Sequence, residues 1–137
     1  MVKEDWKMKK VFCLVLITAL FVGLFALEAF AASWAAPSFS PGDSTQTGNE
    51  TKTSASGTAA NVNISSQTKQ WIYRIRKSDG VFVSNQLRFP STGSHSLGYN
   101  LDGYGNSLGR NGYEYRLNVA LYSQASGIGS SYGVFTP

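Results

Sequence analysis

The chain has 137 residues with 12 Lys or Arg, 8 Asp or Glu, one His and one Cys, and a formal net charge of +4. One cysteine excludes an internal disulfide framework, and one histidine with scattered carboxylates excludes the ligand spacing of a zinc site. Because the cysteine, Cys13, lies in an apolar N-terminal segment, no disulfide can form within the rest of the chain, and we expect the core alone to stabilise it.

Residues 1–31 have the three parts of a bacterial signal peptide. Four lysines within the first ten residues precede an apolar run from Val11 to Leu27, and Ala29 and Ala31 then form a small-x-small exit. We expect cleavage between Ala31 and Ala32 and a secreted product, either extracellular or associated with the cell wall. An uncleaved membrane anchor is the alternative, because the run approaches the roughly 20 residues that span a bilayer.

The next segment, residues 32–61, is dominated by Ser, Thr, Gly and Ala, and Trp34 and Phe39 are its only aromatic residues. A segment of this composition buries too little apolar area to offset the loss of chain entropy. The composition therefore predicts a disordered Ser/Thr/Gly-rich arm.

A two-residue period begins in the segment 69–77. Trp71, Tyr73 and Ile75 alternate there with Ile72 and two arginines, which predicts a strand with an inner apolar face and an outer basic face. The sequence Ser-Asp-Gly at 78–80 favours a tight turn, and the extended residues 81–83 complete a predicted hairpin.

Three further strands follow in the sequence. We expect strands at 86–89, where Leu87 and Phe89 face inward, and at 132–136. The clearest lies at 113–122, and its expected inward residues are Tyr113, Tyr115, Leu117, Val119 and Leu121. With no helical period after residue 61, residues 62–137 are predicted to form an all-β domain of five to seven strands, a small antiparallel β-sandwich or open barrel. Its strand order and its oligomeric state stay open.

The predicted domain contains the segments WIYRI at 71–75, VSN at 83–85, GYEYRL at 112–117 and GVFTP at 133–137. Together these segments resemble a family of small secreted proteins of Gram-positive bacteria that end near a Gly-x-Trp-Ser/Thr-Pro motif. Phe135 stands where that motif has Trp. The resemblance covers about residues 68–137 and implies a β-sandwich and an exported location, without any activity or site residues.

A basic face is the first candidate site. Residues 62–137 carry seven Lys or Arg against three Asp or Glu, a net charge of +4. If the strands share a sheet, their outward arginines form one cationic surface for an anionic cell-wall polymer or a membrane surface. The alternative is a solvated strand face that discourages edge-to-edge pairing. The arginines are Arg74, Arg76, Arg88 and Arg116.

The loop 99–112, rich in Gly, Asn and Tyr, is the second candidate site. Tyr99, Tyr104 and Asn106 are candidate carbohydrate contacts, because tyrosine rings stack on sugars and amides bind their hydroxyls. The alternative is a long strand connection without a ligand.

No motif in the sequence indicates a catalytic site. His95 is the only histidine, and no nucleophile motif accompanies it. We therefore expect no catalytic residues, no metal, no cofactor and no nucleic-acid partner. The sequence favours a secreted, non-enzymatic protein that associates with the cell envelope. One alternative is a bacteriocin-like antimicrobial protein acting on membranes, although the sequence after the cleavage site contains no amphipathic helix. The other alternative is a small secreted hydrolase.

Overall fold

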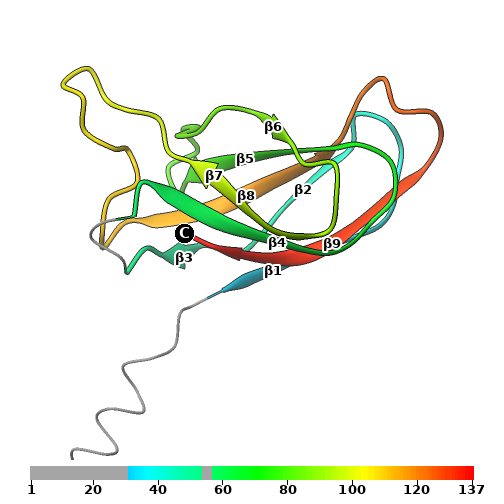
Figure 1. Cartoon of the computed structure of the whole chain (residues 1–137), viewed down its shortest axis with the longest axis horizontal. Helices are drawn as coiled ribbons and strands as arrows, with labels where there is room; N and C mark the ends of the chain where they lie inside the picture. Colours follow the sequence, from blue (N-terminus) through cyan, green and yellow to red (C-terminus); the bar gives the residue numbers. More distant parts are fainter. Residues whose placement is uncertain (1–30, 54–56) are drawn as a thin grey trace, which may run out of the picture.

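Strands make up the regular secondary structure of the computed structural model, which describes residues 31–53 and 57–137. The described residues contain nine strands and no helix, which confirms the predicted all-β sandwich (Figure 1). The strands are β1 Ala32–Phe39, β2 Ser44–Gln46, β3 Glu50–Thr51, β4 Ala59–Gln67, β5 Trp71–Lys77, β6 Leu87–Arg88, β7 Gly93–Gly98, β8 Glu114–Leu121 and β9 Gly129–Thr136.

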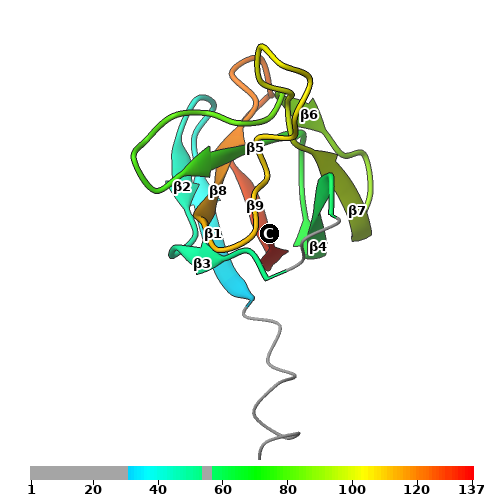
Figure 2. The ribbon, with the colours of Figure 1, turned by 90° about the vertical axis from the view of Figure 1, so that its left-hand side faces the viewer.

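The strands form two antiparallel sheets. The first sheet has the order β1-β9-β4-β7, and the second has the order β2-β8-β5-β6, with β3 also paired to β8. One cluster of buried residues contains side chains from both sheets and forms the core between them. Figure 2 shows the ribbon of both sheets along the long axis of Figure 1. Within the described residues, no helix is long and apolar enough to cross a membrane.

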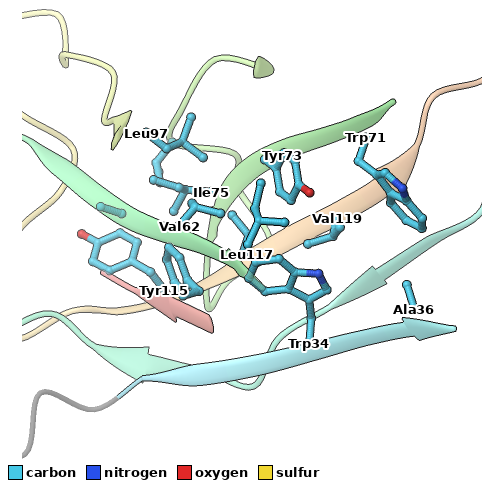
Figure 3. Packing of buried hydrophobic residues seen from close by; sticks show 14 of the residues in the cluster. Trp34, Ala36, Val62, Trp71, Tyr73, Ile75, Leu97, Tyr115, Leu117 and Val119 are labelled. Atoms are coloured by element: carbon cyan, nitrogen blue, oxygen red, sulfur yellow. The ribbon is translucent and has the colours of Figure 1, made fainter. Parts of the chain in front are cut away.

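The two-residue period predicted for β5 and β8 is present in the core. Trp71, Tyr73 and Ile75 of β5 are fully buried, and so are Tyr115, Leu117 and Val119 of β8, with Leu121 nearly so (Figure 3). This alternation leaves the other side chains of both strands on the outer surface of the second sheet.

Two residues predicted to face inward are instead exposed, Leu87 by 40% and Tyr113 by 43%. Leu87 lies in a two-residue edge strand, and Tyr113 precedes the first residue of β8. Both positions lie at the margin of the second sheet, where a regular period does not bring burial. The predicted hairpin after β5 is confirmed: Gly80 has a φ of 96°, and Lys77 N–H donates to the Val81 carbonyl at 2.8 Å.

The arm predicted at residues 32–61 is wrong: its described residues form β1, β2, β3 and the start of β4. Ala32, Trp34 and Ala36 alternate inward along β1, which pairs with β9 as an edge strand. The low apolar content of this segment led to the wrong prediction. A few inward residues are enough for β1, because it covers only one margin of a core whose other side chains come from other strands. The sandwich thus begins at Ala32 rather than at residue 62. The predicted signal peptide falls on residues 1–30, which lie outside the described residues, and on Ala31.

Trp34 joins β1 to the rest of the core. It is 4% exposed, its Nε1–H donates to Ser131 Oγ at 3.1 Å, and its ring lies 5.9 Å from that of Tyr73 in an edge-to-face arrangement. Figure 3 shows Trp34 reaching from β1 into the space between the sheets. Residues 32–39 are therefore a structural strand.

Trp34→Ala is expected to lower the free energy of unfolding by about 3–5 kcal/mol, because it removes a large buried ring and leaves a cavity. Urea denaturation followed by circular dichroism measures this change. Tyr104→Ala, at a side chain that is 92% exposed, is the control and should change stability by less than about 0.5 kcal/mol. Equal, small effects of both substitutions would restore the disordered-arm hypothesis.

Gly133→Ala tests the fit between β9 and Trp34. A Cβ at Gly133 would overlap both the Trp34 ring and the backbone carbonyl of Asn63, so the substitution should cost about 1–3 kcal/mol through overpacking. Gly98→Ala is a matched control in another strand, because a Cβ there meets no atom within 4 Å. Thermal melts of the two variants should differ clearly, and coincident melts would contradict the packing described.

Candidate functional site: an arginine face on the second sheet

The strands that carry the four predicted arginines share the second sheet. Arg76 of β5 is the direct cross-strand partner of Arg116 of β8, and Ile72 of β5 is the partner of Arg88 of β6. Since partners point to the same side of a sheet, and the alternate residues of β5 fill the core, all four arginines lie on the outer surface. We call Arg74, Arg76, Arg88 and Arg116 the arginine face.

Phe82 supports two members of this face. Its ring centroid lies 3.9 Å from Cζ of Arg74 and 4.9 Å from Cζ of Arg76. Arg74 Nε–H also donates to the Ser84 carbonyl at 3.1 Å, and Arg76 Nε–H donates to the Gly80 carbonyl at 2.7 Å. Each guanidinium is therefore oriented through Nε and one flat side, while its terminal nitrogens have no hydrogen-bond partner among the described residues.

Arg76 and Arg116 form a like-charge pair. Like charges directly opposite one another in a sheet are destabilising unless an acidic group lies nearby. The described residues form two ion pairs, Lys77–Asp79 at 3.3 Å and Asp102–Arg110 at 3.0 Å, and neither involves the arginine face. In addition, Arg116 Nε is buried and has no hydrogen-bond partner among the described residues. The pair is thus not neutralised within the part of the protein that the structure describes.

Arg88 marks the other end of the face. Its Cζ lies 4.4 Å from the ring centroid of Tyr122, and its terminal NH1 donates to Gln70 Oε1 at 3.4 Å. Its position beside Ile72 is four residues from Arg76 along β5, or about 13 Å at the rise of a strand. The arginine face is therefore an elongated surface that follows β5.

The structure does not bring the predicted carbohydrate contacts together. Tyr99 is 7% exposed, packs edge-to-face on Tyr115 at 5.2 Å between ring centroids, and belongs to the core. The prediction is wrong for Tyr99 because the inward alternation of β7 continues through Leu97 to Tyr99, a signal that the sequence contains. Tyr104 and Asn106 are exposed, and both backbone N–H groups donate to Asp102 Oδ1, at 2.8 and 3.0 Å.

The Asp102 turn gives a prediction about pH. The backbone N–H groups of Asn106 and Tyr104 are the main cause that lowers the pKa of the Asp102 carboxyl, and Arg110 adds to it. A lowered pKa means that the turn is stabilised above the ordinary carboxyl pKa and loses this stabilisation as the pH falls through the lowered value. NMR titration should show a lowered Asp102 pKa that persists largely in Arg110→Ala. An ordinary pKa in the wild type, or a full return to it in the variant, would contradict this account.

Sequence reasoning missed one buried cation. Lys52, assigned to the arm, is only 1% exposed, and its Nζ lies 5.3 Å from the Tyr99 ring centroid. Burial lowers the pKa of this lysine. Lys52 is therefore separate from the arginine face and contributes no surface charge there.

His95 lies in β7 and stacks on Phe89 at 4.4 Å between ring centroids, with Nε2 2.7 Å from the Ser91 carbonyl. Within residues 31–53 and 57–137, no three His, Cys, Asp or Glu side chains gather in a way that could hold a metal ion. The environment of His95 is thus an aromatic stack with a backbone contact.

Comparisons with protein-family models, with curated proteins and with solved structures find no match to this chain. The resemblance to secreted Gram-positive proteins therefore stays a prediction from short sequence segments.

Proposed function

We propose that this chain is an exported, non-enzymatic binding protein whose arginine face binds an anionic polymer of the cell envelope. The observation that carries the proposal is the Arg76–Arg116 pair, two cations opposite one another on a sheet surface without an acidic partner in the described residues. An anion bound at this pair would supply the acidic partner that the described residues do not provide.

The chemistry of the face favours phosphate or carboxylate groups. Guanidinium groups bind two oxygens of such an anion at once through their planar fork. Stacking on Phe82 and the bonds from Nε hold Arg74 and Arg76 in place before a ligand arrives. Less side-chain freedom is then lost on binding, which favours affinity.

The shape of the face favours a polymer over a single small anion. Arg74 and Arg76 are two residues apart on one strand, or about 7 Å, and Arg88 lies further along the same sheet. Repeated cations along one direction match repeated anions along a chain. The anionic polymers outside a Gram-positive cell, such as teichoic acids, have this property.

The N-terminal sequence supports export. The predicted cleavage between Ala31 and Ala32 coincides with the first residue of β1. A product that begins at Ala32 therefore retains the whole strand that carries Trp34. The predicted signal peptide thus ends where the sandwich begins, which supports the proposal of export.

Co-sedimentation of the chain from Ala32 onward with purified Gram-positive cell walls tests the proposal. Binding to walls that contain teichoic acid is measured in a salt series from about 50 to about 500 mM. It should weaken strongly as the salt concentration rises, because exposed charges are screened over about 8–10 Å at physiological ionic strength. Removal of the teichoic acid should abolish it. Arg76→Ala/Arg116→Ala should reduce wall binding at least about tenfold, which corresponds to 1.4 kcal/mol.

Lys77→Ala/Arg110→Ala is the matched control, since it removes the same charge from two cations that already have acidic partners. It should bind walls nearly as well as the wild type. Equal losses in the two double variants would show that net charge alone matters, and binding that survives high salt would refute the electrostatic proposal.

A further inference from the structure

A hollow of about 300 Å³ adjoins the Arg88 end of the arginine face. It lies between the turn that precedes β5 and the loop that follows β8. Tyr122 N–H donates to the Gln70 carbonyl at 2.9 Å, so these residues extend the pairing of β5 with β8 by one step. By the alternation of β5, Gln70 lies on the same outer surface as the arginines. The lining residues are Lys69, Gln70, Tyr122, Gln124, Ala125 and Ser126.

The lining has the chemistry of a sugar site. Gln70 and Gln124 each carry a donor and an acceptor, which suits the hydroxyl groups of a sugar ring. Tyr122 offers the side of its ring that Arg88 does not cover, with a polar tip. The Tyr122 hydroxyl donates to Gln124 Oε1 at 3.2 Å, which positions the second amide. The lining contains no carboxylate, so an acidic sugar would meet no repulsion from it.

Arg88 links the hollow to the arginine face. It contacts two lining residues, the Tyr122 ring at 4.4 Å and Gln70 Oε1 at 3.4 Å. A sugar in the hollow would therefore lie beside a guanidinium that can take the negative charge of the same polymer.

The backbone at Lys69 is strained. Its φ of 67° is the one positive value outside glycine in the described residues. The left-handed conformation costs roughly 1–2 kcal/mol for a residue with an ordinary side chain. Glycine would relieve this strain, yet the position holds a lysine that lines the hollow. Backbone strain of this kind clusters at active sites, ligand clamps and switch regions.

We infer that the hollow is a sugar-binding subsite at the end of the arginine face and that the bound polyanion carries sugar rings along its chain. One ring occupies the hollow against Tyr122, Gln70 and Gln124, and its anionic group contacts Arg88 and Lys69. This inference rests on the proposed function and adds the substrate class to it.

Three polyanions distinguish binding of a sugar ring from binding of negative charge alone. Polyphosphate has no sugar, whereas polygalacturonate and hyaluronate are carboxylated sugar polymers. Their affinities for the chain from Ala32 onward are measured by isothermal titration calorimetry at two salt concentrations. At least one of the saccharides should bind more tightly per charge than polyphosphate. Gln70→Ala/Gln124→Ala, which leaves the charge unchanged, should weaken that saccharide about tenfold and polyphosphate less than twofold.

Gln86→Ala, an exposed amide outside the hollow, is the control and should leave all affinities unchanged, while thermal melts verify that every variant is folded. If polyphosphate binds and the double variant weakens neither saccharide more than polyphosphate, the sugar subsite is wrong and the proposed function stands. If none of the three polymers binds, this inference fails, while co-sedimentation with cell walls decides the proposed function separately.

Discussion

The register between β5 and β8 is the constraint on which the rest of the structure depends. Trp71 faces Leu121, Tyr73 faces Val119 and Ile75 faces Leu117, so both strands give their apolar residues to the core. A slip of one residue would bury the arginines and expose the aromatic rings. The same register therefore forces Arg76 opposite Arg116 on the outer surface. Core packing maintains a like-charge pair that the surface residues would not favour by themselves.

The first sheet completes this core from residues of low apolar content. Ser131 connects the two sheets, because its Oγ accepts from Trp34 Nε1–H and lies 3.1 Å from the Tyr73 hydroxyl. Burial raises the pKa of Tyr73 to about 12, so the hydroxyl stays protonated and available to this network. Gly133 provides the close approach that lets the Trp34 ring lie against β9. Small residues in β1 and β9 are thus a requirement of the packing.

The sequence allowed β5 and β8 to be predicted because their period is strong and their apolar residues are large. It did not allow β1 to be predicted, since alanine and serine carry little hydrophobic signal and the benefit of burying Trp34 depends on β9, about 100 residues away. The arginine face could be predicted as outward positions, but not its pairing, which needs the strand order. Tyr99 shows the opposite error: a residue typical of sugar contacts lies in the core because strand alternation continues into the loop. The hollow beside Arg88 joins two turns distant in sequence, and no local pattern marks it.

Under the proposed function, the Arg76–Arg116 pair serves binding rather than stability. The most direct test compares the free energy of unfolding of the wild type and Arg116→Gln at low salt, with and without saturating cell-wall polyanion. Without ligand, the variant should be as stable as the wild type or more stable, because the repulsion is relieved. With ligand, the wild type should become the more stable protein, since a ligand stabilises the folded state that binds it better. If Arg116→Gln is clearly less stable without ligand, or if the polyanion stabilises both proteins equally, the arginine pair is structural and the central claim is wrong.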